Sequence, residues 1–382
     1  MKNHKSKFKK LSKIISKFSP EIRGFYISVI ACLVIFISLL LALPHLLPHE
    51  LTPNQIRQQK AAQGLHVQGN KILNGLGQQV ILHGVDRSGT EYQCVHDTGK
   101  IFDGPDDAAS IQAMKDWKIN AVRIPLNEDC WLGINEATPS GELYRQAITT
   151  YVDLINQHHM FAIVDLHWNA PGTDKATGQQ DMADKDHALA FWDSVAQIFK
   201  NNPAIIFDLY NEPRNISWEC WKNGMGCETE FPTVSMQEMI DTVRATGANN
   251  LLLLGGLDFS NNLSGWLANK PTDPINNLAA SWHMYGKNKC DTKKCWDKTV
   301  APVMAKVPVI AGEFGESYND SVCGISTSNE FMNWMDQHQS GYLAWAWDVW
   351  STKCSNLSLI TNYDGTPKTP NGVNYKNHLK KF

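Results

Sequence analysis

Short apolar runs alternate with amphipathic segments through most of this chain. Segments of helical period lie between several of the runs, at 106–117, 143–159, 188–201 and 234–247. Eight strands that alternate with helices over about 300 residues are typical of an α/β protein with a (β/α)8 TIM barrel. The runs are VILHGVD (80–86), NAVRIPL (120–126), FAIVDLHW (161–168), AIIFDLYNEP (204–213), LLLLGG (251–256), LAASWHMY (278–285), VPVIAGEFG (307–315) and YLAWAWDVW (342–350).

An open, doubly wound parallel sheet is the alternative arrangement for this alternation. Such a sheet ordinarily carries a Gly-rich phosphate loop after an early strand, and GGLDFSNN at 255–262 is not such a loop. The stretch LHVQGNKILNGLGQQVILHGV (65–85) alternates apolar and polar residues and turns at Asn and Gly. It predicts an N-terminal β-hairpin that leads into the first barrel strand.

The N-terminus follows a different pattern. Residues 24–43 (GFYISVIACLVIFISLLLAL) contain no charge and are long enough to cross a bilayer as one transmembrane helix. The basic segment 1–23 predicts a cytoplasmic N-terminus for this signal anchor. The alternative is a cleaved signal peptide, whose apolar core is typically shorter. Residues 44–63 are expected to form a stalk, and 64–382 the folded domain.

Charge is unevenly distributed along the chain, and this excludes one class of function. Residues 1–23 hold seven Lys and one Arg against a single Glu, whereas the whole chain has a formal net charge of -3. The domain after the apolar segment is therefore acidic and lacks the basic surface that nucleic acid binding requires. Its 13 Trp suit stacking on sugar rings as well as core packing.

Eight of the nine cysteines follow the apolar segment, and an even number in an exported domain suggests disulfides. Two pairs are close enough in sequence to act as loop staples, and two natural pairs remain, although spacing alone does not fix the connectivity. No CxxC or HxxxH cluster accompanies them, so no metal site is expected. The expected pairs are Cys220/Cys227, Cys290/Cys295, Cys94/Cys130 and Cys323/Cys354.

Polar and aromatic residues gather where the apolar runs stop. In a (β/α)8 barrel the C-terminal ends of the strands meet at one face, where active sites form. Six of the eight runs deliver such residues there, which core packing alone does not explain. They are Arg123, His167, Asn211 with Glu212, His283 with Tyr285, Glu313, and the Trp345/Trp347 pair.

Two of these groups are carboxyls, Glu212 and Glu313, on runs expected to face each other across the barrel mouth. Facing carboxyls suit hydrolysis of a glycosidic bond, in which one protonates the leaving oxygen and the other attacks the anomeric carbon or activates water. A separation of about 5–5.5 Å gives retention of configuration, and a wider one gives inversion. Arg123 and Tyr285 are expected to stabilise the charge of the nucleophile.

Together the motifs resemble glycoside hydrolase family 5, the cellulase family of retaining barrel enzymes, from about Leu65 to Trp350. The most specific element is LYNEP (209–213). In the family pattern its Glu is the general acid/base and the preceding Asn holds the sugar 2-hydroxyl, which implies these roles for Glu212 and Asn211. GEFG (312–315) resembles the nucleophile motif and implies that role for Glu313.

Further motifs extend the resemblance. NAVRIPLNEDCWLG (120–133) carries the strand-two Arg123, DLHW (165–168) supplies His167, and HMY (283–285) matches a His-x-Tyr pair whose Tyr285 would hydrogen-bond the nucleophile. WAW (345–347) matches the Trp beneath the reacting sugar. Because residues 345 and 347 would point the same way on a strand, Trp347, nearer the mouth, is the expected platform. Asp86 departs from the Asn that the pattern favours, which affects a substrate contact rather than the chemistry.

Additional carboxyls lie near the expected mouth. Glu91 and Glu128 are expected in loop salt bridges or sugar contacts, and Glu316 on the loop after the seventh strand. Asp165 precedes His167 by two residues, so it should face the same way but deeper and give structural support.

The resemblance implies a retaining, endo-acting β-glycosidase that hydrolyses internal β-1,4-glucosidic bonds of a cellulose-like polysaccharide. A β-mannan, xyloglucan or other β-glucan is the alternative substrate within the family. A catalytically silent carbohydrate-binding protein is the alternative from another class, but it would be expected to have lost one carboxyl. No metal, organic cofactor or protein partner is implied. The catalytic domain should lie outside the cytoplasm, membrane-anchored or secreted.

Overall fold

The computed structural model describes residues 19–20, 64–316, 324–350 and 357–382. The chain divides into two compact units, 1–57 and 58–382, and the elements described below belong to the second. The apolar segment at 24–43 and the stalk at 44–63 lie outside the described residues, as does all of the basic segment except residues 19 and 20. Among the described residues, no helix is both long enough and apolar enough for a membrane span.

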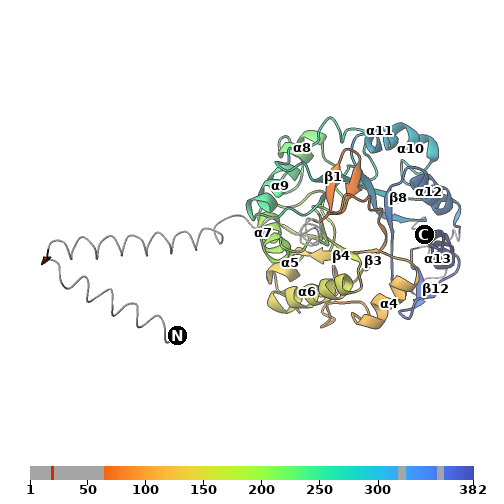
Figure 1. Cartoon of the computed structure of the whole chain (residues 1–382), viewed down its shortest axis with the longest axis horizontal. Helices are drawn as coiled ribbons and strands as arrows, with labels where there is room; N and C mark the ends of the chain where they lie inside the picture. The colour runs from red at the N-terminus through yellow and green to blue at the C-terminus, as the bar shows by residue number, and fades with distance from the viewer. Residues whose placement is uncertain (1–18, 21–63, 317–323, 351–356) are drawn as a thin grey trace. The chain divides into compact units, whose positions relative to one another are not determined.

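Eight parallel strands close into a barrel in the order β10-β3-β4-β5-β6-β7-β8-β9, and Figure 1 shows the helices as a ring around them. Each predicted apolar run overlaps one of these strands, so the predicted (β/α)8 barrel is confirmed. The strands are β3 (His83–Asp86), β4 (Ala121–Asn127), β5 (Phe161–Trp168), β6 (Ile205–Asp208), β7 (Leu252–Gly255), β8 (Leu278–Tyr285), β9 (Val309–Gly315) and β10 (Gly341–Ala344).

The four helical segments predicted from periodicity correspond to α4, α6, α7 and α9. Local capping explains where several helices begin; for example, the Ser235 hydroxyl and the Glu238 carboxylate form a reciprocal capping box at α9. The helices are α4 (Ala108–Asp116), α5 (Glu128–Leu132), α6 (Glu142–Gln157), α7 (Ala188–Phe199), α8 (Trp218–Asn223), α9 (Met236–Ala245), α10 (Lys293–Thr299), α11 (Ala301–Met304), α12 (Ser326–Gln337) and α13 (Asn371–Leu379). Two short strands, β11 (Ile360–Asn362) and β12 (Thr366–Pro367), pair between β10 and α13.

The predicted N-terminal hairpin is formed by β1 (His66–Gln68) and β2 (Lys71–Leu73), which pair antiparallel. Leu65 and Ile72 pack in one apolar cluster with residues near the starts of the barrel strands, such as Ala121, Ile163 and Ile310. The Val67 backbone N–H also donates to the Asn277 side chain at 2.9 Å. The hairpin therefore closes the N-terminal end of the barrel and leaves the opposite end for the site.

Side chains inside the barrel change character along the strands. On β4, Ala121 belongs to the interior apolar cluster, Val122 packs outward against the helices, and Arg123 points inward again. The same step from apolar to charged occurs from Ile163 to Asp165 on β5. The barrel interior thus has an apolar lower layer and a charged upper layer, and the charged layer is the floor of the mouth.

Three disulfides join Cys94 to Cys130, Cys220 to Cys227 and Cys290 to Cys295. The first ties the loop after β3 to helix α5, across 36 residues of sequence. These three predicted pairs are confirmed. The fourth, Cys323 with Cys354, lies outside the described residues.

Candidate active site

A β-bulge aims Glu313 into the barrel. Ile310 lies inside and Ala311 packs outward, so strict alternation would turn residue 313 outward as well. Between β8 and β9, however, Trp282 pairs with Ala311 while His283 pairs with Glu313, which leaves Gly312 as an extra residue. A Cβ at position 312 would lie 2.6 Å from the Ser281 hydroxyl and 3.1 Å from His283 Nε2, so a larger residue would have to displace these buried side chains. The extra residue brings the carboxyl of Glu313 to the mouth.

Arg123 is the centre of the charged layer and is completely buried. Its Nη1 donates to Asp86 Oδ1 at 3.0 Å and to Glu313 Oε1 at 2.8 Å. Its Nε donates to Asp208 Oδ2 at 3.1 Å. One guanidinium therefore joins side chains of β3, β6 and β9 to its own strand β4.

The remaining guanidinium nitrogen, Nη2, faces two more partners. It donates to Asn211 Oδ1 at 2.9 Å and lies 3.1 Å from Asp165 Oδ2 on β5. Four buried carboxyls thus surround one cation, and they cannot all ionise easily in such a place. Burial raises the pKa of Asp165 and of Asp208 to about 7, against the attraction of Arg123.

The Glu313 carboxyl is held at both oxygens and is only 3% exposed. Arg123 donates to Oε1, and the Tyr285 hydroxyl donates to Oε2 at 2.6 Å. The predicted contact between Tyr285 and this glutamate is present. The two donors therefore fix the orientation of the Glu313 carboxyl.

Glu212 follows β6 by four residues and faces Glu313 across the mouth. It is 7% exposed, and burial raises its pKa to about 7 even though the Arg123 and Arg214 cations oppose the shift. Carboxyl oxygens of Glu212 and Glu313 lie within 4.8 Å of each other. The two carboxyls therefore face each other at close range in different surroundings, one able to hold a proton near neutral pH and one held by donors.

Two neutral histidines support the carboxyls. Burial lowers the pKa of His283 to about 3 and that of His167 to about 4. His283 Nδ1 lies 2.9 Å from Glu212 Oε1 and 3.6 Å from Glu313 Oε2. The His167 ring lies between Asp165 Oδ2, at 2.8 Å from Nδ1, and the Asn211 amide, at 3.4 Å from Nε2. The supporting position predicted for Asp165 is confirmed.

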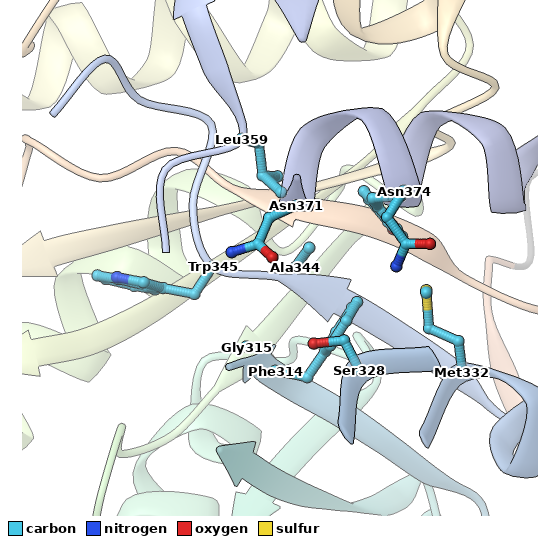
Figure 2. Close-up of a pocket in the computed structure, with 10 residues that line it drawn as sticks. Phe314, Gly315, Ser328, Met332, Ala344, Trp345, Leu359, Asn371 and Asn374 are labelled. Carbon is cyan, nitrogen blue, oxygen red and sulfur yellow. The ribbon is translucent and has the colours of Figure 1, made fainter. Parts of the chain in front are cut away.

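The preference for Trp347 as the sugar platform is wrong. Trp347 is 0% exposed and packs edge-on against Trp117, with ring centroids 4.8 Å apart. Trp345 is partly exposed and stacks on His167 at 5.4 Å. Figure 2 shows its indole projecting away from the pocket residues of α12 and α13. Strand β10 ends at Ala344, so the alternation assumed for 345 and 347 does not apply beyond it.

Other residues were missed or placed differently by sequence reasoning. Asp208 was missed, although a lone Asp in the apolar run AIIFDLYNEP was a usable signal. Gln179, from the loop after β5, hydrogen-bonds the Glu212 carboxyl. No pattern in the sequence indicated this contact. Asp86 is buried against Arg123 rather than open to a substrate.

Comparison with known proteins identifies the family. Residues 81–351 match the family model described as cellulase (glycosyl hydrolase family 5). Because this match covers more than half of the chain, the protein belongs to that family of glycoside hydrolases.

Individual relatives are more distant. The chain is 25% identical over 301 residues to an endoglucanase, MaCel5A, of Microbulbifer sp. (strain ALW1), covering 75% of this chain and 53% of that protein. It is 23% identical over 322 residues to a mannan endo-1,4-beta-mannosidase of Streptomyces lividans, and the match covers 82% of this chain and 73% of that protein. It thus spans about half the length of the endoglucanase. A crystal structure of beta-glucanase SdGluc5_26A from Saccharophagus degradans in complex with cellotetraose shares the fold, with a TM-score of 0.64, 20% identity, and coverage of 83% of this chain and 93% of that one.

The raised pKa of Glu212 predicts a stability difference that depends on pH. The folded state disfavours the charged carboxyl, so the free energy of unfolding should fall between about pH 4.5 and 7 as the pH rises. Glu212→Gln stays neutral at every pH. The variant should match the wild type near pH 4 and exceed it at pH 8 by up to about 3 kcal/mol.

Unfolding in urea at several pH values would measure this difference. Glu142→Gln, at an exposed position of α6, is the control and should show no such trend. A Glu212→Gln protein that is no more stable than the wild type at pH 8 would contradict the buried, proton-holding environment.

Proposed function

We propose that this protein is a retaining, endo-acting β-1,4-glucanase that cleaves internal bonds of a cellulose-like polysaccharide by double displacement. The observation that carries the proposal is the close pair of unlike carboxyls at the barrel mouth. Their oxygens approach within 4.8 Å, which fits the short separation of retaining enzymes, about 5–5.5 Å, better than the wider one that leaves room for water.

In the first step, a Glu313 oxygen attacks the anomeric carbon while Glu212 gives its proton to the departing glycosidic oxygen. A covalent glycosyl–Glu313 ester forms and the glycosidic C–O bond breaks. In the second step, the Glu212 carboxylate takes a proton from water, whose oxygen attacks the same carbon and releases Glu313. Each glutamate ends the cycle in the state in which it began.

The surrounding residues fit supporting roles in these steps. Arg123 and Tyr285 orient the attacking carboxylate, and the neutral His283 steadies Glu212 through Nδ1. The Asn211 amide nitrogen carries two hydrogens, and its contact with His167 uses one, which leaves the other for a sugar hydroxyl. Trp345 supplies the partly exposed indole face on which a pyranose ring would stack.

The choice of substrate rests on the relatives. An endoglucanase and a structure with bound cellotetraose favour a β-1,4-glucan. The mannosidase of Streptomyces lividans, of which the chain covers 73%, makes β-mannan the second candidate. A silent binding protein would not need two close carboxyls with unlike surroundings.

The three disulfides favour an oxidising compartment. The proposal therefore includes a catalytic domain outside the cytoplasm, either membrane-anchored or secreted.

Chemical rescue should separate the roles of the two glutamates. With a 2,4-dinitrophenyl β-cellotrioside, whose leaving group needs no acid, Glu313→Ala should use azide as the nucleophile and release an α-glycosyl azide. Glu212→Ala should form the covalent intermediate and then release a β-glycosyl azide. Both variants should lose at least about 10³-fold in activity on unactivated cellulose, measured by reducing ends, with the azides assigned by NMR.

Glu316→Ala is a matched control, because Glu316 is a buried carboxyl three residues beyond Glu313. It should yield no glycosyl azide. If Glu313→Ala released the β-glycosyl azide and Glu212→Ala the α-glycosyl azide, the two roles would be reversed. Full cellulase activity in either catalytic variant would reject the assignment.

Parallel assays on carboxymethyl-cellulose, lichenan, xyloglucan and mannan would test the substrate. Mannose differs from glucose in the orientation of the 2-hydroxyl, next to the reacting carbon, so a site built to bind one epimer should reject the other. We expect kcat/KM on the glucans to exceed that on mannan by roughly 10²-fold or more. Activity on mannan alone would replace the glucanase proposal with the mannanase.

A further inference from the structure

A second group of acidic and imidazole side chains lies where the loop after β5 meets the start of α5. Glu128, Asp184 and His187 each offer one ligand atom, and these atoms all lie within 4.8 Å of one another. His187 Nδ1 is 3.5 Å from Asp184 Oδ1 and 3.9 Å from Glu128 Oε2. None of the three takes part in the proposed glycosidase steps.

Glu128 is the unusual member of this group. Its side chain is completely buried. Its nearest polar neighbours are the Asp184 carboxyl and the Ala170 backbone, but neither carboxyl oxygen makes a hydrogen bond of normal geometry with a described residue. The loop contact predicted for Glu128 is a long one: His187 Nδ1, at 3.9 Å from Oε2, is its one ion-pair partner in the described chain. A buried polar group without partners costs stability, so its presence calls for something that satisfies it.

Asp184 is fixed in place, in contrast to Glu128. Its Oδ1 accepts from the backbone N–H groups of Asp186 and His187, at 3.1 and 2.9 Å, and its Oδ2 accepts from the Asn169 amide at 3.0 Å. It therefore faces Glu128 as a rigid acceptor. Two acceptors that face each other in a buried place need a proton or a cation between them.

The ligand set and spacing fit a cation. Zn²⁺ binds His nitrogen and Asp or Glu oxygen at about 2.0–2.2 Å, which places ligand atoms roughly 3.4 Å apart in a tetrahedron and at most about 4.4 Å apart. The separations of 3.5 and 3.9 Å at His187 Nδ1 fall in that range. An imidazole among the ligands favours Zn²⁺ over Ca²⁺ or Mg²⁺. The half-buried His187 gives access from solvent.

We propose that Glu128, Asp184 and His187 bind one Zn²⁺ ion, with water completing the coordination. His187 would bind through Nδ1 in the tautomer protonated at Nε2, and would give up its 3.4 Å contact with the Ala170 carbonyl. Carboxylate and imidazole groups bind a metal in their deprotonated forms, so zinc binding should strengthen as the pH rises.

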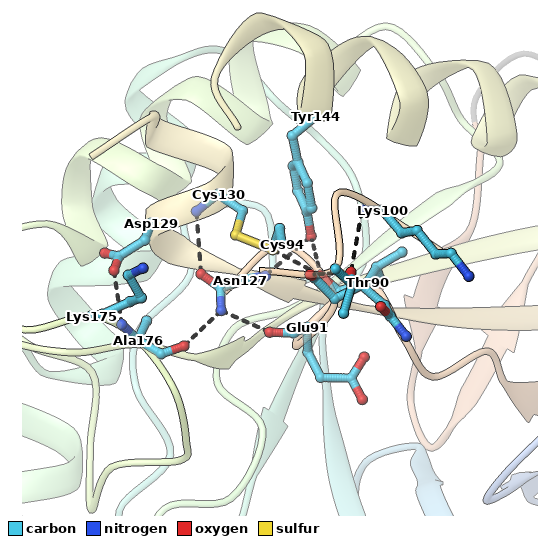
Figure 3. The surroundings of a disulfide bond; sticks show 12 residues. Thr90, Glu91, Cys94, Lys100, Asn127, Asp129, Cys130, Tyr144, Lys175 and Ala176 are labelled. Carbon is cyan, nitrogen blue, oxygen red and sulfur yellow. Dashed lines mark hydrogen bonds between the residues drawn. A yellow bond between two sulfur atoms is a disulfide. The ribbon is translucent and has the colours of Figure 1, made fainter. Parts of the chain in front are cut away.

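The position suggests a structural task. Glu128 directly follows β4, whereas Asp184 and His187 close the loop that carries Gln179 to the Glu212 carboxyl. A bound ion would fasten that loop to the barrel. Figure 3 shows the neighbouring ties of the same loop, in which the Asn127 amide donates to the Ala176 carbonyl and Asp129 accepts from the Ala176 N–H. The ion would add a third tie on the other side of α5's first turn.

Zinc binding to the full chain tests the proposal. The protein would be stripped with EDTA, dialysed against Zn²⁺, and analysed for bound metal and for Tm. The wild type should bind one equivalent with a higher Tm. Glu128→Gln and His187→Gln should each weaken binding by about 100-fold or more, because losing even an outer partner of a metal ligand costs 10- to 100-fold. Glu91→Gln, which also changes a buried carboxyl to an amide, should bind like the wild type.

The rival explanation is a proton shared between Glu128 and Asp184. It predicts no saturable zinc site in the wild type, and a Glu128→Gln protein that keeps its Tm because the amide still donates to Asp184. That result would overturn the proposal, as would zinc binding in Glu128→Gln equal to the wild type, or tighter binding of Ca²⁺ than of Zn²⁺. Glu212, His283 and Glu313 also lie within 4.8 Å of one another, so Glu212→Gln is measured beside the wild type. One equivalent of zinc in both places the ion outside that group even if a Glu128 variant fails to fold, and loss of the zinc in Glu212→Gln would overturn the proposal.

Discussion

The buried guanidinium of Arg123 is the interaction on which the rest of the mouth depends. Arg123 lies on β4, and four other strands each place one carboxyl against its guanidinium. These carboxyls are Asp86 on β3, Asp165 on β5, Asp208 on β6 and Glu313 on β9. A charge buried this deeply is tolerable only when it is paired and hydrogen-bonded, and removing one partner of such a pair typically costs about 3–5 kcal/mol. The side chain that fixes the barrel's upper layer therefore also fixes the orientation of the proposed nucleophile, so the stability of this layer and the geometry of the site have the same origin.

The two glutamates differ because of their positions relative to that guanidinium. Glu313 accepts directly from Arg123 and Tyr285. Glu212 has a neutral histidine at 2.9 Å, and burial dominates its pKa. The two glutamates therefore have different electrostatic environments, although their carboxyl oxygens lie within 4.8 Å of each other. The acid and the nucleophile of glycoside hydrolysis need different environments, because one must donate a proton and the other must attack as a carboxylate.

Much of this arrangement was predictable from the sequence because it depends on periodicity. The eight apolar runs became eight strands, and the polar residues at their ends met at one mouth, including Glu212, Glu313 and Arg123. The failures have local causes. Trp347 was preferred by strand alternation, but β10 ends before it. Glu313 faces inward only because Gly312 forms a bulge, which alternation cannot reveal. Glu128 was expected in a loop salt bridge or a sugar contact. Its partners, His187 at 3.9 Å and the neighbouring Asp184, became visible only when the loop after β5 was placed beside it.

The central claim is that the close pair of Glu212 and Glu313 hydrolyses the glycosidic bond by two displacements at the anomeric carbon. Proton NMR of the anomeric region during the first minutes of cellopentaose hydrolysis tests it most directly. Two displacements at one carbon restore its configuration, so the β-anomer of the new reducing end should appear first and the α-anomer should grow later by mutarotation. Initial accumulation of the α-anomer would mean a single displacement by water and would contradict the account.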